Sequence, residues 1–367
     1  RLRNALEEGS EMPTGQKLGG GIGLKATMRA VQPHYVQARA SLDEARRGQS
    51  GEVRRGVGVA SGWKGIGRLG GSNLSQALVE LGQDGRVRLF TGACDIGQGS
   101  STTLAQIAAF ELKLPLESIE VISADTDLTP DCGLTSASRQ TYMSGNAVMV
   151  ASRSLRQALL TTASRALERK IEDLELRDGA LTSISDPTVK LSLREVAALC
   201  IEAGTPLRHK GSFDTPSPKL DPETGQGIIS NPNVYATQMA EVEVNTRTGE
   251  VKVLRVVAAQ DVGRAVNMNG VEGQVEGGAI MGLGFALMEE FVHGKTFGFN
   301  QYRIPTTKHM PELVSIIVEE PDPKGPYGAK GAGENSSLAA APAIINAIHD
   351  ACGARVFNLP ATPKRVL

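Results

Sequence analysis

Apolar positions along the chain follow two spacings, which predict short strands and longer helices. Alternation predicts strands at 56–60, 74–80, 86–91, 118–124, 235–244, 251–260 and 314–318. A period near 3.6 residues predicts helices at 104–112, from 141 to about 171, at 193–203, at 273–290 and from 338 onward. Residues 1–50 are charged and helix-prone, and Pro33 interrupts a pattern running to Arg47, which indicates a surface helical arm. Hairpins alternate with long helices, so we expect an α+β fold with mixed sheets and packed helices.

Two turns and one composition change predict the domain organisation. Asp84-Gly85 lies between two strands, and both residues tolerate the positive φ of a type I′ hairpin. Residues 245–249 predict a second hairpin with a longer loop. Residues 172–231 look loop-rich apart from the helix at 193–203, with a Pro/Gly/Asp-rich stretch at 215–227. We therefore expect a helical arm at 1–54 and subdomains at 55–230 and 231–367, with the ligand bound between the subdomains.

Composition excludes several kinds of protein. The 39 basic and 40 acidic residues nearly cancel, which disfavours binding to nucleic acid or to an anionic membrane surface. No apolar run approaches the roughly 18 residues of a membrane span, and no signal peptide opens the chain, although Arg1 in place of Met leads us to expect a preceding piece. The cysteines lie far apart, at 94, 132, 200 and 352, so we expect reduced thiols in a cytoplasm and no metal site made of protein ligands.

Two polar loops next to predicted helix starts carry part of the candidate chemistry. Residues 97–103 follow a strand and precede a helix, which can offer backbone N–H groups to a phosphate but also fits an ordinary turn. They lack the lysine of a Walker loop and the spacing of a dinucleotide fold. Residues 135–141 contain four hydroxyls, an amide and Arg139, which suits a phosphate, although a solvated helix start explains them as well.

The third loop, Gly328-Ala329-Lys330-Gly331-Ala332-Gly333-Glu334, carries a carboxylate. Its glycines let the backbone bend tightly and approach a ligand, and the Asn335-Ser336-Ser337 cluster is a helix-start signal. Exposed N–H groups at a helix N-terminus favour the ionised form of a carboxylate. Glu334 is therefore a candidate base, and an ordinary first-turn glutamate is the alternative.

Four ordered motifs resemble the molybdopterin-binding subunits of the xanthine dehydrogenase and aldehyde oxidase family. They are Asp95-Ile96-Gly97-Gln98-Gly99, Ala137-Ser138-Arg139-Gln140-Thr141, Gly273-Gln274-Val275-Glu276-Gly277 and the loop 328–334. The resemblance implies that Gln98 and Gln274 bind the molybdenum cofactor and that Glu334 is the catalytic glutamate. It also implies a cofactor-binding role for the remaining matched positions, which are Gly97, Gly99, Ala137, Ser138, Arg139, Gln140, Thr141, Lys330, Gly331 and Gly333.

The resemblance implies a molybdenum hydroxylase that inserts oxygen from water into a C–H bond of an N-heterocycle, or of an aldehyde as the alternative substrate. Such a reaction needs a base, and Glu334 in that role would contribute roughly 10²–10⁴-fold. The metal would be held by the cofactor's dithiolene, in plain molybdopterin or in a cytosine dinucleotide form. The chain has neither an iron–sulfur cysteine pattern nor a flavin motif, so those centres are expected on partner chains.

The resemblance covers only the second half of the family's molybdenum subunit. The first half is therefore an expected partner, either as a separate subunit, as in bacterial hydroxylases similar to nicotinate dehydrogenase, or as the rest of a longer chain. We also expect residues 63–71 to form a ligand-facing loop in which Lys64 and Arg68 suit an anionic substrate such as a ring carboxylate, with simple solvation as the alternative. A non-catalytic pterin- or nucleotide-binding module remains open, whereas a P-loop-like nucleotide binder is disfavoured.

Overall fold

The computed structural model describes residues 1–46, 51–68, 71–215, 219–230 and 232–367. They form two compact units: unit 1 comprises Arg1–Gly65, Pro232–Pro323 and Ala332–Leu367, and unit 2 comprises Ile66–Asn231 and Lys324–Gly331. Four predictions fall partly outside the described residues: the helix end at Arg47, the loop 63–71, the stretch 215–227 and the boundary at Asn231.

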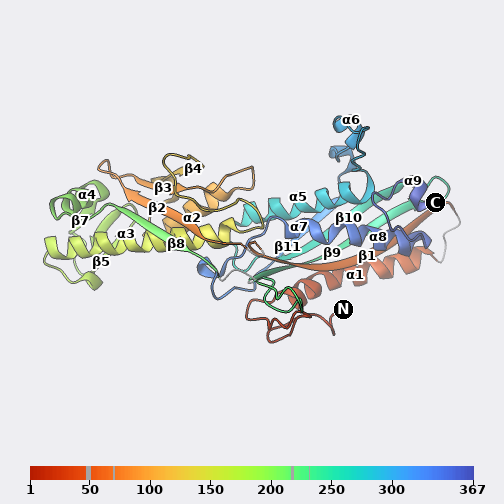
Figure 1. The fold of residues 1–367 in the computed structure, drawn as a ribbon, viewed down its shortest axis with the longest axis horizontal. Helices are drawn as coiled ribbons and strands as arrows, with labels where there is room; N and C mark the ends of the chain where they lie inside the picture. Colours follow the sequence, from red (N-terminus) through yellow and green to blue (C-terminus); the bar gives the residue numbers. More distant parts are fainter. Residues whose placement is uncertain (47–50, 69–70, 216–218, 231) are drawn as a thin grey trace. The chain divides into compact units, whose positions relative to one another are not determined.

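Unit 1 is built on a mixed sheet with the strand order β1-β9-β10-β11 (Figure 1). Strands β1, β9 and β10 are antiparallel, and β10 and β11 are parallel. Its elements are α1 (Leu24–Arg46), β1 (Val53–Gly65), β9 (Asn233–Asn245), β10 (Val251–Asp261), α5 (Met268–Leu287), α6 (Phe299–Tyr302), η4 (Thr307–His309), β11 (Glu312–Val318), α7 (Asn335–Leu338), α8 (Ala340–Cys352) and α9 (Pro363–Val366).

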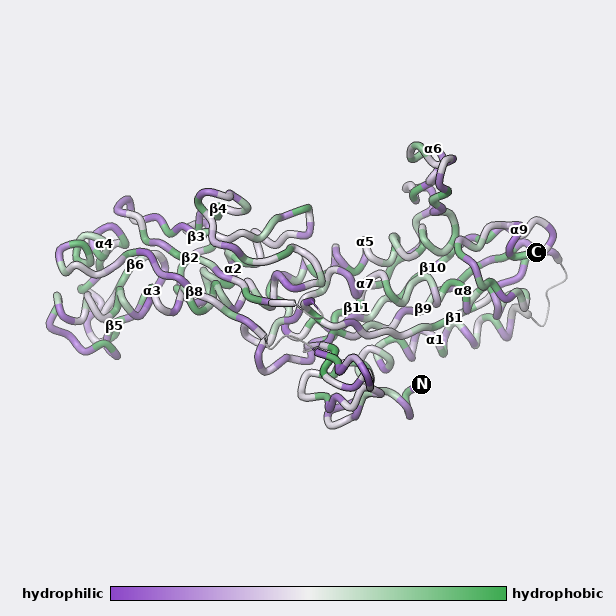
Figure 2. Tube along the Cα trace, viewed as in Figure 1, coloured by the Kyte–Doolittle hydropathy of each residue, from purple (hydrophilic) through white to green (hydrophobic). Residues whose placement is uncertain are grey.

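Helices cover both faces of this sheet. On one face Val31 and Leu42 of α1 pack against Val57, Met239 and Val257. Figure 2 shows hydrophilic and hydrophobic residues alternating along α1, as expected of a helix with one buried face. On the other face α5 and α8 enclose a second apolar cluster. The N-terminal helix is therefore part of the core of unit 1, not the surface arm that we expected.

Unit 2 contains two smaller sheets. The mixed sheet has the order β4-β3-β2-β8, with β3 and β4 parallel, and the antiparallel sheet has the order β5-β6-β7. The elements are β2 (Ser75–Leu81), β3 (Val87–Thr91), α2 (Ser100–Leu112), η1 (Leu116–Ser118), β4 (Ile119–Ser123), the π-helix η2 (Gln140–Ser144), α3 (Gly145–Ala166), η3 (Ile171–Asp173), β5 (Leu174–Arg177), β6 (Ala180–Ser183), β7 (Lys190–Ser192), α4 (Leu193–Glu202), β8 (Arg208–Phe213) and η5 (Pro326–Gly328).

The α+β class with mixed sheets is confirmed, but several local predictions are wrong. The described residues between 172 and 230 hold four strands, which are short or polar and so give little apolar alternation. Helix α3 ends at Ala166 and not near Ile171, and Glu168 beyond it has a left-handed φ of 51°. Of the two central residues at the first hairpin, only Gly85 has a positive φ, so the turn is not type I′. Pro33 lies inside an unbroken α1.

The two units do not follow the predicted boundaries at 54 and 230. Strand β1 pairs along its whole length with β9, which places residues 55–65 in unit 1 together with the N-terminal helix. Residues 324–331 belong to unit 2, so the boundary runs through the third polar loop. Within the described ranges, none of the helices has the length and apolar character needed to cross a membrane.

Candidate functional site

The loop that carries Glu334 is fixed to three neighbouring strands of unit 1. Lys64 of β1 places its Nζ 2.6 Å from Oε2 of Glu334. Gln238 of β9 donates from Nε2 to the carbonyl of Ser336 (2.5 Å), and Gln260 of β10 donates to the carbonyl of Ala332 (2.6 Å). Three polar side chains therefore hold residues 332–336 at the loop's middle and at both ends.

Strand register puts these three side chains on one face of the sheet. Ala60 pairs with Gln238, and Lys64, four residues further along β1, points to the same side because side chains alternate. Gln260 pairs with Ala236, two residues from Gln238 on the same face. Sequence reasoning missed both glutamines, although a lone amide within an otherwise apolar strand was a signal that could have found them.

Glycines on β1 let the helices above it come close enough for this contact. A Cβ on Gly56 would lie 2.2 Å from the carbonyl oxygen of Ala347, and a Cβ on Gly58 would lie 2.2 Å from that of Ala343. At Gly62 the nearest atom would be Cβ of Leu338, at 3.6 Å. The face thus runs through small residues every second position until Lys64, which is long enough to reach Glu334.

Gln274 lies beside the same loop. A Cβ on Gly333 would be 3.5 Å from Oε1 of Gln274, and a Cβ on Gly278 would be 2.1 Å from Oγ of Ser336. Gln274 and Gly278 are four residues apart on α5, so the close packing at Gly278 brings Gln274 to Gly333. Among the described residues, none hydrogen-bonds the Gln274 side chain. Its amide is therefore available to a ligand next to Glu334, whose side chain is 47% exposed.

In unit 2, the loop before α2 uses its polar groups on itself. The carboxylate of Asp95 accepts hydrogen bonds from the backbone N–H groups of Gly97 (3.0 Å), Gly99 (3.2 Å) and Ser101 (3.0 Å). Partial burial acts to raise the pKa of Asp95, but these hydrogen bonds prevail and lower it below 3.8. Three of the N–H groups expected to face a phosphate, those of Gly97, Gly99 and Ser101, thus bond to a carboxylate of the chain.

Gln98 is also satisfied within this loop. Its Oε1 accepts from the N–H of Ile96 (2.6 Å), and its Nε2 donates to the carbonyl of Cys94 (2.9 Å) and to Oγ of Ser100 (3.1 Å). Gly97 and Gly99 have positive φ, and a Cβ at either position would meet no atom within 4 Å. Open space therefore lies beside the loop, whereas the amide of Gln98 would have to turn to reach a ligand.

Arg139 is a buried structural residue and not an open anion site. It is 1% exposed, and its guanidinium donates to the carbonyls of Cys132, Leu134 (3.1 Å), Asn73 (2.6 Å) and Leu74 (3.0 Å). Burial lowers the pKa of Arg139 from its ordinary value. A direct phosphate contact, as expected from the sequence, is not available to a side chain used in this way.

Gln140 stabilises the loop of residues 134–140 through hydrogen bonds within unit 2. Its Nε2 donates to Oγ1 of Thr135 (2.8 Å), and its Oε1 accepts from Oγ of Ser144. Together with Thr141 it begins the π-helix η2, a conformation often found at functional sites. Gln140 itself is 7% exposed, so it shapes the loop and does not present an amide to solvent.

The loop before η2 contains backbone strain. Ala137 and Ser138 have φ values of 55° and 52°, which non-glycine residues adopt only where the surroundings impose them. The carbonyl of Ala137 accepts from the N–H of Gly67 (3.0 Å), and a Cβ on Gly331 would lie 1.8 Å from the carbonyl oxygen of Ser138. The structure thus brings together the predicted residues 137–138 and Gly331, next to Lys330, which is 3% exposed.

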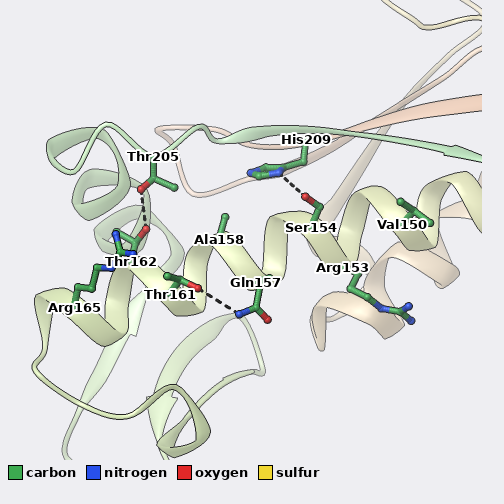
Figure 3. Close-up of a pocket in the computed structure, with 10 residues that line it drawn as sticks. All are labelled: Val150, Arg153, Ser154, Gln157, Ala158, Thr161, Thr162, Arg165, Thr205 and His209. Carbon is green, nitrogen blue, oxygen red and sulfur yellow. Dashed lines mark hydrogen bonds between the residues drawn. The ribbon is translucent and has the colours of Figure 1, made fainter.

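The predicted residues are divided between the two units. Glu334, Gln274 and Gly333 lie together in unit 1, and the 97–99, 137–141 and 330–331 positions belong to unit 2. A separate groove runs along α3 in unit 2 and contains a hydrogen bond between Ser154 and His209 (2.8 Å), but none of the predicted residues lines it (Figure 3).

The residues of unit 1 fit an organic cofactor better than a bare metal ion. Across the part of the chain that the structure describes, no three histidine, cysteine, aspartate or glutamate side chains gather as a metal site. Instead, the loop offers the carboxylate of Glu334, and α5 offers the carboxamide of Gln274, which no described residue hydrogen-bonds. A Cβ on Gly333 would come no closer than 3.5 Å to Gln274. This donor set suits a ligand with several hydrogen-bonding edges, such as a pterin.

The sequence matches the molybdopterin cofactor-binding domain family over residues 30–311, and the chain belongs to that family. It is 33% identical to the 6-hydroxypseudooxynicotine dehydrogenase complex subunit gamma of Paenarthrobacter nicotinovorans, over 89% of this chain and 41% of the relative. It is 31% identical to the putative xanthine dehydrogenase molybdenum-binding subunit of Escherichia coli (strain K12), over 100% of this chain and 48% of the relative.

Among solved structures, the aldehyde oxidoreductase from Desulfovibrio gigas superposes with a TM-score of 0.85 and 30% identity, over 100% of this chain and 37% of that one. The chain thus spans less than half the length of each of these relatives. The family and the fold expected from the four motifs are confirmed.

Proposed function

We propose that this chain provides the proton-accepting part of a molybdenum hydroxylase site that acts on a C–H bond of an N-heterocycle or an aldehyde. The observation that carries the proposal is the exposed carboxylate of Glu334, on a loop fixed to three strands and next to the available amide of Gln274. When bound, the molybdenum cofactor would supply the oxygen transfer and accept the two electrons.

The chain's own residues would bind, orient and accept a proton. Glu334 would take the proton on its carboxylate, which Lys64 holds in place at 2.6 Å. Gln274 would hydrogen-bond an edge of the pterin, and Gly333 would let that edge approach the backbone. In unit 2, the cofactor would be lined by Gly97, Gly99, Ala137, Ser138, Thr141, Lys330 and Gly331. Gln98 would turn toward the cofactor, while Arg139 and Gln140 would stabilise the loop that contains Ala137 and Ser138.

Partner chains are part of the proposal because the chain spans less than half of its relatives. One partner would be the first half of the molybdenum subunit, and the others an iron–sulfur and an FAD protein, assembled in the cytoplasm. The cofactor would be molybdopterin or its cytosine dinucleotide.

The proposal is tested on natively purified protein together with the chains that accompany it. We expect molybdenum near one atom per copy of this chain and iron on a partner, measured by elemental analysis, and reduction of an artificial electron acceptor when a heterocycle or an aldehyde is added. Bound molybdopterin without substrate-dependent reduction would favour a non-catalytic binding module. Absence of molybdenum from the intact assembly would overturn the proposal.

A further inference from the structure

Lys64 is a cation that faces the candidate base. Its ammonium lies 2.6 Å from Oε2 of Glu334, donates to the carbonyl of Gly65 at 3.2 Å, and its side chain is 25% exposed. An ammonium carries three N–H donors, and the described part of the chain supplies acceptors for two of them. One donor therefore remains for an acceptor beside Glu334.

The pairing of β1 with β9 fixes the backbone position of Lys64 and the face of the sheet on which its side chain lies. Its backbone pairs with Val234 in β9, and the small residues Gly58, Ala60 and Gly62 precede it on the same face. These let α7 and α8 pack close to the strand, so that the loop before α7 lies within reach of one long side chain. The pair is thus built by the register of the sheet.

Proton transfer to Glu334 changes the charge balance of this pair. When Glu334 accepts a proton, it loses its negative charge and Lys64 loses its counter-ion. An uncompensated ammonium opposes that transfer, because an opposite charge nearby favours the ionised form of a carboxyl group. An anionic group of the substrate at the remaining donor of Lys64 would replace the lost counter-ion.

We propose that Lys64 selects substrates that carry a carboxylate or a comparable anionic group near the reacting carbon. This inference rests on the proposed function and names the substrate class for that site. The ammonium that holds Glu334 in the ligand-free protein receives the substrate's anion and balances the charge as Glu334 takes the proton. Neutral substrates lack that compensation, so Lys64 disfavours them.

The first experiment compares two matched ligands on the purified assembly. Steady-state turnover is measured with pyridine-3-carboxylate and with its neutral counterpart pyridine-3-carboxamide, for wild type, Lys64→Met and Lys64→Arg. Lys252→Met serves as the control, since Lys252 is an exposed residue on β10 in the same unit. Molybdenum content and melting temperature are measured for each variant, so that a folding defect is recognised.

We expect Lys64→Met to lower kcat/KM for both ligands, because both lose the residue that holds Glu334. The loss should be about 10- to 100-fold larger for the carboxylate, which also loses its own counter-ion. Lys64→Arg keeps the positive charge and should restore most of the carboxylate activity. Equal losses for both ligands would mean that Lys64 only positions Glu334, and the inference would be overturned. If Lys64→Met does not fold, wild type and Lys64→Arg are compared for their preference for the carboxylate over the carboxamide. A preference for the carboxylate in both proteins supports the inference. The absence of that preference from both proteins overturns it.

A second readout needs no turnover. Glu334→Gln removes the competing carboxylate, so pyridine-3-carboxylate should bind this variant about tenfold more tightly than it binds wild type, as measured by calorimetry. The double variant Glu334→Gln/Lys64→Met should lose that gain, and carboxamide binding should not change in either. Unchanged carboxylate binding in Glu334→Gln would overturn the inference. Undiminished turnover in Glu334→Gln would instead overturn the proposed function, so the two failures can be told apart.

Discussion

Both units contain a hairpin, a helix, a parallel strand and a further helix in that order, but they use their polar residues differently. In unit 2 the hairpin β2-β3 leads through α2 to the parallel strand β4 and then to α3, and β8 adds the fourth strand. In unit 1 the hairpin β9-β10 leads through α5 to the parallel strand β11 and then to α7 and α8, and β1 adds the fourth. Gln98 precedes the crossover helix of one unit, and Gln274 lies within that of the other.

The difference lies in where hydrogen-bonding groups are directed. In unit 2 the side chains of Asp95, Gln98 and Arg139 bond to backbone groups of their own unit. In unit 1, side chains of β1, β9 and β10 bond to the loop 332–336. The carboxylate of Glu334 is exposed, and no described residue hydrogen-bonds the Gln274 amide. The motif of unit 2 thus bonds largely within its own unit, whereas that of unit 1 presents an exposed carboxylate, to which the proposed function assigns the proton transfer.

The largest effect is expected from Glu334→Gln. Glutamine keeps the shape and the Lys64 contact but cannot take up the proton, so turnover should fall roughly 10²–10⁴-fold while molybdenum content is unchanged. The measurement is substrate-dependent dye reduction together with elemental analysis. Glu272→Gln, at an exposed position of α5, is the matched control and should remain active. Near-normal turnover of Glu334→Gln would show that Glu334 is not the proton acceptor.

Arg139→Met should cause the next largest effect, on stability. It leaves the carbonyls of Asn73, Leu74, Cys132 and Leu134 without their donor in a buried region, at a cost of about 3–5 kcal/mol in the free energy of unfolding. Urea unfolding of the variant gives this value. A stable Arg139→Met protein with weakened cofactor retention would instead indicate that Arg139 binds the cofactor directly. The two units would then both direct polar side chains toward the cofactor.

Asp95→Asn is expected to lower the free energy of unfolding by about 1 kcal/mol, since one oxygen that accepts from the first turn of α2 is replaced by a donor. Because the pKa of Asp95 is lowered in the folded protein, its contribution is present above pH 3.8 and is lost as the pH falls through the lowered value. The difference between wild type and variant should therefore shrink below about pH 4. A difference that grows on acidification would contradict the hydrogen bonds assigned to the carboxylate.

Gln274→Ala should have the smallest effect on stability, below about 0.5 kcal/mol, because no described residue hydrogen-bonds the side chain that is removed. Cofactor retention should nevertheless decrease, which molybdenum analysis after dialysis would detect. Gln98→Ala is the informative comparison, since it loses bonds to Ile96 and Cys94 and should destabilise its loop. Similar stability losses in both variants would contradict the inference that Gln98 stabilises its loop and that Gln274 does not.

The sequence predicted the parts of the fold that local patterns determine. The hairpins around Gly85 and residues 245–249, the crossover helices and the final strand follow from apolar periodicity and turn residues. The strand Arg208–Phe213 escaped because only its Gly211 is buried, and that position lacks a side chain. The core position of α1 was missed because Met239 and Val257, on which it packs, lie more than 190 residues away in the sequence.

For the site, motifs identified residue types but not their contacts. Glu334 and Gln274 were named from the sequence, and Lys64 was expected to meet an anion, but its pairing with Glu334 depends on the register of β1 against β9. The bonds of Arg139 to four carbonyls were not foreseen, because an arginine in a polar loop looks the same whether it faces a ligand or carbonyls of the chain. Burial, which a single sequence does not give, separates these cases.

The three-point attachment of residues 332–336 has an entropic consequence. Ordering a flexible residue costs about 1–2 kcal/mol of conformational entropy, so a loose five-residue loop would weaken ligand binding by roughly 5–10 kcal/mol. In this chain Lys64, Gln238 and Gln260 have already restricted the loop when the sheet forms. Ligand affinity is then coupled to the integrity of the strands that hold the loop. A substitution that loosens β9 or β10 should increase the rate of ligand loss without changing a residue that contacts the ligand.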